Sequence, residues 1–281
     1  MFESEGWDVV FALVNKAFAT APTRLELIAP MDPADAARPR GGRKVYDSQA
    51  PRTIRTHATV VATPDIVALA ERVRRAGVRH WFQEPAQDVP FQRLWLGVPV
   101  GHVGDYDPDA GDGGFRFEFL PSNSSAFSPK LFQRPEDEPR PGEAGFRRIR
   151  HRAFLVGDID ASLATLERVF GWEPAHAVTD EPSRGYRFVD MSANHGHGAT
   201  LRLVQATDPD SAAGRTFAAE GPGAWTITVA AYDLDATAAD LAARGTAFRR
   251  LAPGKAEPEA LVPDLTGGLQ GAITLVPDSI G

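Results

Sequence analysis

Apolar and polar residues alternate along this chain in two rhythms, one typical of helices and one typical of strands. In residues 65–76, apolar side chains recur at spacings of three and four, which predicts a helix. Gly77 suits the left-handed position that often ends a helix. A β-branched run at 56–62 precedes this helix and predicts a strand. Three more strands are predicted after it, at residues 78–82, 92–96 and 115–120.

This order of one strand, one helix and three strands returns twice. The second copy comprises strand 150–156, helix 160–170 and strands 173–177, 186–190 and 200–205. The third comprises strand 226–229, helix 234–243, strand 246–251, a weak region at 258–270 and strand 272–276. Two opening strands, 7–14 and 23–28, look like the end of a further copy that lacks its first strand and helix. The pattern predicts an α+β fold of repeated βαβββ modules, three complete and one partial, which pair into two open, cupped sheets.

The composition between the modules predicts the domain boundaries. An N-terminal domain is expected over residues 1–120, with a partial module at 1–30, a loop at 31–53 and a module at 54–120. Residues 121–145 are rich in Pro, Ser, Glu and Asp and are expected to form a linker. A C-terminal domain is expected over residues 146–281, with modules at 146–208 and 222–281.

The bulk composition excludes several classes of protein. The net charge of −7 argues against a general nucleic-acid binder, which would normally show a basic face. The absence of cysteine excludes disulfides, thiolate metal sites and cysteine nucleophiles. No apolar run approaches the roughly 18 residues of a membrane span, and no signal peptide is recognised, so we expect a cytoplasmic protein without a membrane partner. The abundance of Gly, Pro, Ala and Arg indicates a GC-rich genome, and we expect a bacterial source.

Two predicted strands carry an acid between apolar residues. They read Arg-Leu-Glu at 24–26 and Arg-Phe-Glu at 116–118. A half-buried carboxylate costs free energy unless it is paired, and a shared cation is a natural partner for Glu26 and Glu118. His57 lies on a third predicted strand. Arg24 and Arg116 precede their glutamates by two residues and should point to the same side, where they either bind an anionic substrate or neutralise the acids.

The repeated module and two helix starts resemble the vicinal oxygen chelate superfamily, which is also called the glyoxalase/bleomycin resistance/dioxygenase superfamily. The helix starts read Asp-Ile-Asp-Ala at 158–161 and Asp-Leu-Asp-Ala at 233–236, where the family has Asp-Leu-Asp-Ala. The resemblance implies that paired modules form a cup around a divalent metal ion. It also implies that the ligands are a histidine on the first strand and a glutamate on the last strand of each module.

Carried over residue by residue, the resemblance implies a metal site in the N-terminal half. Glu26, His57 and Glu118 occupy ligand positions, and mixed N/O ligands suit Zn, Ni, Co, Mn or Fe(II) without selecting among them. In the C-terminal half only His151 remains, facing Arg202 and two threonines at the other positions, Thr226 and Thr274. A one-residue slip of the strand register would put Trp225 in place of Thr226, and neither is a strong ligand. The resemblance therefore implies a metal-free C-terminal half, and His151 is expected to be an interior histidine.

The fourth ligand of the family would lie on a first strand that precedes residue 7. Two explanations are open. The sequence starts late, at an internal methionine, or a partner subunit completes the sheet, which would make the protein a homodimer. We favour the first explanation slightly. A cup with three protein ligands is chemically workable, because catalytic sites keep positions open for water or substrate.

For activity, the resemblance implies a metal-dependent isomerase or lyase of the glyoxalase type that acts on a small, oxygenated and anionic substrate through an enolate-type intermediate. Glu118 or Glu26 would shuttle the proton, and Arg24, Arg116 and Trp95 would bind the substrate. One alternative is a metal-free protein of the same fold that binds small, drug-like molecules in a cup lined by aromatic residues. A ring-cleaving dioxygenase relative is a further alternative, although such enzymes place two histidines and one glutamate in the C-terminal modules.

Overall fold

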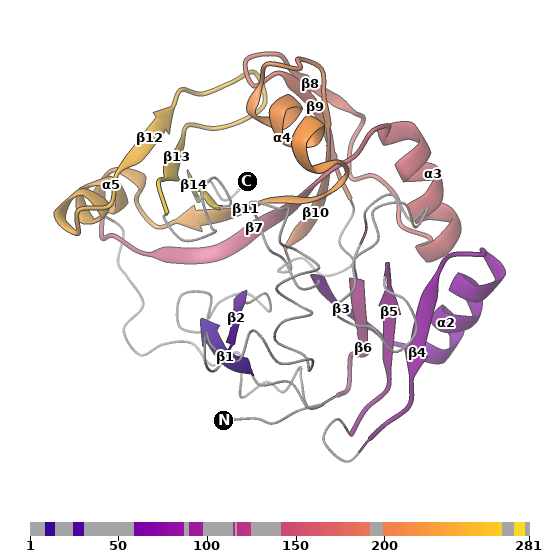
Figure 1. The fold of residues 1–281 in the computed structure, drawn as a ribbon. Helices are drawn as coiled ribbons and strands as arrows, with labels where there is room; N and C mark the ends of the chain where they lie inside the picture. Colours follow the sequence, from indigo (N-terminus) through magenta and orange to yellow (C-terminus); the bar gives the residue numbers. More distant parts are fainter. Residues whose placement is uncertain are drawn as a thin grey trace.

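The structure is a computed structural model that describes residues 9–14, 25–30, 59–86, 90–97, 115, 117–124, 142–191, 199–265 and 273–278, the first two segments by their backbone alone. The described strands form three sheets, of two, four and eight strands (Figure 1). The α+β fold class predicted from the sequence is confirmed. None of the described helices is long and apolar enough to cross a membrane.

The two-stranded sheet contains the two opening strands that the sequence predicts. β1 (Val9–Val14) and β2 (Leu25–Pro30) run antiparallel, and Glu26 pairs with Leu13 in their register. This pairing is what the last two strands of a module would show.

The four-stranded sheet belongs to one complete module, with strand order β3-β6-β5-β4. Its elements are β3 (Thr59–Thr63), α2 (Ile66–Arg75), β4 (His80–Gln83), β5 (Arg93–Leu96) and β6 (Phe117–Pro121). The first and last strands lie side by side in parallel, while the other pairs are antiparallel. Asp65 starts α2, because its carboxylate accepts a hydrogen bond from the backbone N–H of Ala68 at 2.9 Å.

The eight-stranded sheet joins two modules edge to edge, in the order β12-β13-β14-β11-β7-β10-β9-β8. The first comprises β7 (Phe146–Leu155), α3 (Ile159–Phe170), β8 (Thr179–Glu181), β9 (Tyr186–Asp190) and β10 (Thr200–Ala206). The second comprises β11 (Gly223–Ala231), α5 (Leu234–Ala243), β12 (Phe248–Leu251), β13 (Ala260–Pro263) and β14 (Ile273–Pro277). Antiparallel pairing of β7 with β11 makes the junction, and the sheet curves into an open half-barrel (Figure 1).

Two features of the C-terminal half differ from the sequence prediction. The strand predicted at 173–177 is wrong: only Pro174 makes an isolated bridge, to Met191, and the edge strand β8 begins at Thr179. Proline has no N–H to donate to a ladder, so pairing does not extend there. The helix α4 (Ala212–Glu220) was not predicted, although Ser211 caps it through a hydrogen bond from the N–H of Gly214. It lies inside the curve of the sheet (Figure 1), where Ala213 packs with the buried residues of the concave face.

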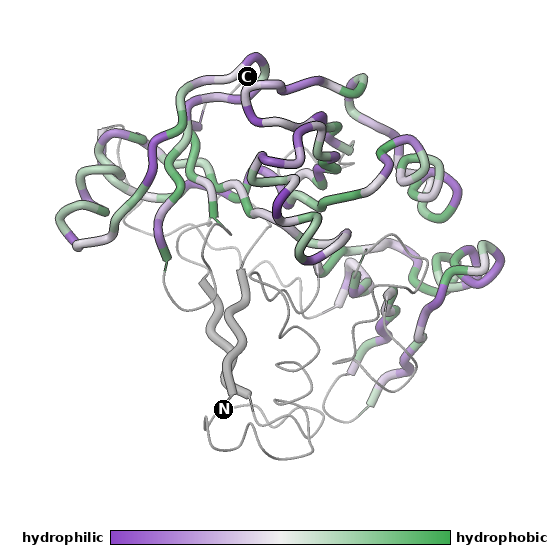
Figure 2. Tube along the Cα trace, turned by 45° about the horizontal axis from the view of Figure 1, so that its top comes forward, coloured by the Kyte–Doolittle hydropathy of each residue, from purple (hydrophilic) through white to green (hydrophobic). Residues whose placement is uncertain are grey.

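The largest core lies between the two complete sheets, where α2 and α3 pack against each other. Arg72 donates to the carbonyl of Phe170 at 3.1 Å, and Arg168 donates to the carbonyl of Ala76 at 2.7 Å, so each helix covers the end of the other. Buried members of this core come from both modules, among them Val73, Phe117, Phe154, Leu166 and Leu203. Figure 2 shows hydrophobic and hydrophilic residues interspersed along the described helices and strands of the two larger sheets.

Candidate functional site

The four-stranded sheet has one face toward α2 and one face away from it. Phe117 and Phe119 of β6 pack in the core with α2, as strand alternation predicts for Phe117. Glu118, between them, therefore points to the other face. The strand register places it beside Val60 on one side and Trp95 on the other. The sequence assigns this face to the inside of the N-terminal cup, which stays a prediction because the described strands β1 and β2 form a sheet of their own.

Glu118 has a cationic neighbour on this face. Its Oε1 lies 3.6 Å from Nη1 of Arg93, and the two side chains are only 12% and 10% exposed. Burial lowers the pKa of Arg93, and the charge and hydrogen bonding of Glu118 partly offset this effect. The pair is therefore a largely desolvated carboxylate and guanidinium. Removing either partner alone would leave the other charge desolvated and unpaired, which destabilises the fold.

Trp95 forms the wall next to this pair. Its ring lies 5.4 Å from the guanidinium carbon of Arg93, and its indole N–H donates to Gln83 at 3.3 Å. Trp95 is 1% exposed, and it pairs in register with Trp81. Arg93 was not among the residues predicted for the site, although strand alternation indicates it, because it precedes Trp95 by two residues and shares its face.

The other predicted site residues of the N-terminal half are not described to the same extent. Glu26 lies on β2, whose side chains are not described, and His57, Arg24 and Arg116 lie outside the described residues. Within the described part of the chain, no three His, Asp or Glu side chains gather into a group that could hold a metal ion. The metal set of Glu26, His57 and Glu118 thus stays a prediction, for which the structure supplies the position of one carboxylate.

The C-terminal half-barrel carries polar residues in a row on its concave face. Thr228 pairs with His151 and with Thr274, so these three lie on adjacent strands. Ile227 and Val229 pack in a core with residues of α5, as predicted, which leaves Thr228 on the concave side. Thr228 and His151 are 4% and 7% exposed.

Arg202 dominates the electrostatics of this concave face. It makes two hydrogen bonds to Asp190, with Nε to Oδ1 at 2.6 Å and Nη2 to Oδ2 at 2.8 Å. Its remaining terminal nitrogen, Nη1, donates to Glu257, which lies in the segment between β12 and β13. The guanidinium carbon also lies 4.0 Å from the ring centre of Phe188. One buried cation therefore holds two carboxylates from different modules.

Burial and the charge of Arg202 shift the pKa values of the neighbouring Asp190 and His151. Burial raises the pKa of Asp190, but the hydrogen bonds and charge of Arg202 outweigh burial, and the net pKa lies below its ordinary value of 3.8. Burial lowers the pKa of His151 well below 6.5, and the positive charge of Arg202 lowers it further. At neutral pH, His151 is accordingly an uncharged imidazole. Arg202 stands where the family has a glutamate and is paired with Asp190 and Glu257. The metal-free C-terminal half stays a prediction.

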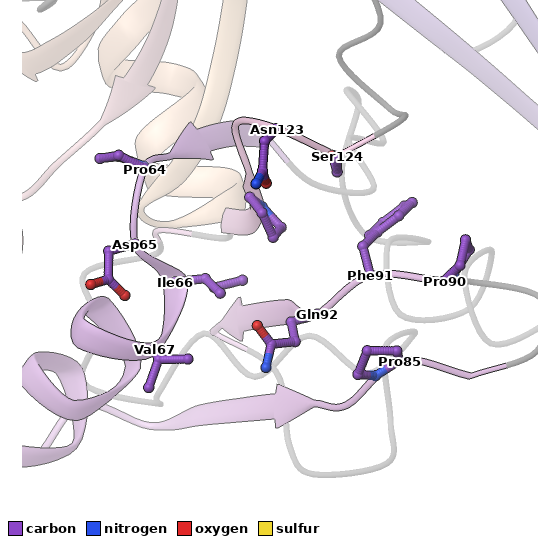
Figure 3. Close-up of a pocket in the computed structure, with 11 residues that line it drawn as sticks. Pro64, Asp65, Ile66, Val67, Pro85, Pro90, Phe91, Gln92, Asn123 and Ser124 are labelled. Carbon is purple, nitrogen blue, oxygen red and sulfur yellow. The ribbon is translucent and has the colours of Figure 1, made fainter.

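A separate cavity of about 590 Å³ lies at the edge of the four-stranded sheet, beside the first turn of α2 (Figure 3). Prolines make up much of its wall, with Phe91, Gln92 and Asn123 alongside. It lies at the end of the sheet where β3, β4 and β6 finish and β5 begins.

Comparison with known proteins supports the resemblance seen in the sequence. Residues 150–259 match the family model described as Glyoxalase/Bleomycin resistance protein/Dioxygenase superfamily. No curated protein matches. Among solved structures, the chain is similar to methylmalonyl-CoA epimerase from Mycobacterium tuberculosis, at 21% identity over 46% of this chain and 86% of that one, with a TM-score of 0.41. It is also similar to the Streptomyces coelicolor epimerase in complex with 2-nitronate-propionyl-CoA, at 24% identity over 48% and 97%, with a TM-score of 0.43. A hypothetical protein from Bacillus halodurans matches at 12% identity over 48% and 96%, with a TM-score of 0.42.

Proposed function

Because residues 150–259 carry a domain of the glyoxalase/bleomycin resistance protein/dioxygenase superfamily, we propose that this chain is a glyoxalase-like, metal-dependent isomerase or lyase. Its substrate is a small, oxygenated and anionic molecule that reacts through an enolate-type intermediate. The active site is the N-terminal cup. The observation that carries this proposal is the place of Glu118, a carboxylate that is only 12% exposed, on the face of the four-stranded sheet that lies away from α2.

The residues of this cup suit a divalent ion. Glu26, His57 and Glu118 would hold it, because two carboxylates and an imidazole are good ligands for Zn, Ni, Co, Mn or Fe(II). Bound there, such an ion supplies Lewis acidity toward the oxygens of the substrate. The C-terminal half offers no equivalent set among its described residues, because Arg202 stands at the glutamate position and is paired with Asp190 and Glu257.

Within this mechanism, Glu118 takes a proton from the carbon next to a substrate carbonyl and returns it at an adjacent atom. Glu26 shares this role as the second carboxylate of the cup. Arg93 lies 3.6 Å from Glu118 and positions its carboxylate on this face. Arg24 and Arg116 bind the anionic end of the substrate, and Trp95 excludes water from one side of the reacting atoms.

The metal content of the protein tests the proposal. Protein purified without a metal-affinity tag is expected to contain about one transition-metal ion per chain by mass spectrometry. Glu118→Gln should lose most of this metal and its turnover, whereas Glu71→Gln should keep both, because Glu71 is an exposed acid of α2 paired with Arg74 and Arg75. Full turnover in Glu118→Gln would contradict the proton-transfer role.

One observation favours a second candidate, a metal-free protein that binds small molecules in the same cup. Arg93 already gives Glu118 a cationic partner, and Trp81 and Trp95 pair beside it, so the described part of the cup resembles an aromatic binding wall. If the purified protein contains only traces of transition metal and still binds small aromatic molecules, this candidate replaces the enzyme. The substrate-binding residues would then be tested by Trp95→Leu, which should weaken binding.

A further inference from the structure

The cavity of about 590 Å³ beside the first turn of α2 is not used by the proposed function (Figure 3). Its volume lies within the roughly 300–1,000 Å³ that is typical of small-molecule pockets. None of the described residues that line it belongs to the set assigned to the N-terminal cup. The cavity is therefore a separate space for a small molecule, and its lining decides which chemistry it suits.

Rigid apolar side chains form most of the wall of this cavity. The described lining includes four prolines: Pro64 after β3, Pro121 at the end of β6, and Pro85 and Pro90 between β4 and β5. Phe91 lines it as well, together with Val67, which is 57% exposed although it is a large apolar residue. Packing a flat ring against proline rings costs little side-chain entropy, because these rings have almost none to lose. The walls therefore suit an aromatic ring.

Three polar side chains adjoin these apolar walls. Gln92 precedes β5, and Asn123 and Ser124 lie in the turn after β6. In Figure 3, the side chains of Asn123 and Gln92 project from their segments on either side of Ile66 of α2. Each carboxamide carries both hydrogen-bond donors and an acceptor. A ligand that also carries both, such as an amide, is complementary to them.

The hydroxyl of Ser124 is the group that points most directly to a ligand. Its oxygen is buried and has no hydrogen-bond partner within the described part of the chain. A buried hydroxyl without a partner costs free energy, and a ligand that bonds with it removes this cost. Gln92 is weakly engaged too, because its amide nitrogen makes a long contact of 3.4 Å to the carboxylate of Glu84.

The charge of the lining favours an uncharged ligand. Asp65 is the one ionisable side chain among the described lining residues. Its carboxylate caps α2 by accepting a hydrogen bond from the N–H of Ala68 at 2.9 Å, so an acid already occupies the positive end of the helix. An anionic ligand would meet this carboxylate with no cation in the described lining. Asp65 is exposed to solvent, so its attraction for a cationic ligand is weak.

We propose that this cavity is a binding site for small, uncharged aromatic amides. The ring of the ligand lies between the proline rings and Phe91. Its amide group bonds with the carboxamides of Gln92 and Asn123 and with the hydroxyl of Ser124. Aromatic and apolar walls with a few placed polar groups are typical of such sites. The site goes beyond the function proposed for the N-terminal cup and does not depend on it.

Calorimetric titration of the full chain with nicotinamide tests this site. The wild type should bind nicotinamide at least about tenfold more tightly than nicotinate, whose carboxylate is charged, or pyridine, which lacks the amide. Ser124→Ala should bind nicotinamide roughly 3- to 10-fold more weakly, the range expected for one lost hydrogen bond. Without ligand it should unfold at the same temperature as the wild type, because its hydroxyl has no partner in the described fold. Ser122→Ala is the matched control, since Ser122 lies in the same turn but is exposed, and its affinity should equal that of the wild type.

The outcomes separate the proposal from its alternatives. Weaker binding of nicotinamide in Ser124→Ala, and also in Asn123→Ala, which changes an exposed side chain, supports it. The proposal is overturned if Ser124→Ala and Ser122→Ala bind nicotinamide equally, or if the wild type does not bind it up to its solubility. Equal or tighter binding of nicotinate also overturns it, because the end of α2 would then be acting on an anion. A lower unfolding temperature of ligand-free Ser124→Ala would show that the hydroxyl serves the fold, and it counts against the proposal in the same way. Metal loading of the N-terminal cup, measured on the same samples, should be unchanged.

Discussion

Replacing Glu181 by glutamine tests how the C-terminal half-barrel is closed. Glu181 is a fully buried acid that connects the edge strand β8 to the segment between β12 and β13. Its carboxylate accepts hydrogen bonds from three backbone N–H groups and from the hydroxyl of Ser183. Glutamine keeps the shape of the side chain. It replaces one accepting oxygen by an NH₂ group, which would face backbone donors.

The expected loss follows from these contacts. A hydrogen bond to a charged group contributes about 1.5–3 kcal/mol, and a buried donor left without an acceptor costs a similar amount. The amide oxygen retains part of the network, so we expect Glu181→Gln to lower the free energy of unfolding by roughly 3 kcal/mol. For a domain of this size the midpoint of thermal unfolding should fall by roughly 6–12 °C.

The pH dependence of this loss is a second check. Burial raises the pKa of Glu181, but its hydrogen bonds outweigh burial and bring the pKa below its ordinary value of 4.5. Its stabilising effect is therefore complete above that value and is lost as the pH falls through the lower pKa of the folded state. Thermal melts of the wild type and Glu181→Gln should differ by a constant amount near neutrality and converge in acid. Hydrogen exchange should show faster exchange at the amides of Lys255 and Ala256 in the variant.

Glu259 is a half-exposed acid of the same region that pairs with Arg250, so Glu259→Gln is the control, and its free energy of unfolding should lie within about 0.5 kcal/mol of the wild type. If Glu181→Gln matches this control, the carboxylate does not hold the segment and the reasoning fails. A difference that persists unchanged into acid would mean that shape, and not charge, explains the loss.

Further substitutions examine the same contacts and the core. Gly254→Ala should destabilise by about 1–3 kcal/mol in chemical denaturation, because an added Cβ would lie 2.5 Å from Oε1 of Glu181; an unchanged midpoint would show that the segment can shift. Leu166→Ala should lower the free energy of unfolding by about 2–5 kcal/mol, since Leu166 on α3 is 0% exposed in the core between the sheets. Val67→Ala on α2 should be nearly neutral, because Val67 is 57% exposed. Equal effects of these two would contradict the assignment of the core.

The sequence determined the modules because their signals are local. α2 and α3 begin next to Asp65 and Asp158, whose side chains cap the first backbone N–H groups, and these starts depend on a few adjacent residues. The helix predicted at 234–243 matches α5 in both bounds. The misses have local causes too: Pro174 interrupts a pairing, and α4 is a short helix whose start at Ser211 carries little apolar periodicity.

Strand alternation also determined which face each site residue occupies. It places Glu118 on the other face of its strand from the core residues Phe117 and Phe119, and it places Thr228 on the other face from Ile227. Alternation is a property of one strand. It therefore says toward which side a residue points, but not which residue from another strand it meets there.

Only the tertiary structure decided these partners. Arg93 meets Glu118 because β5 and β6 pair in one register, and Arg202 meets Glu257 because the curved sheet brings a segment 55 residues away across its concave face. The energy of a buried ion pair depends on distance and desolvation, which arise only when distant segments pack together. The sequence thus determined the modules and the face of each acid, while the folded chain decided which acids are already paired.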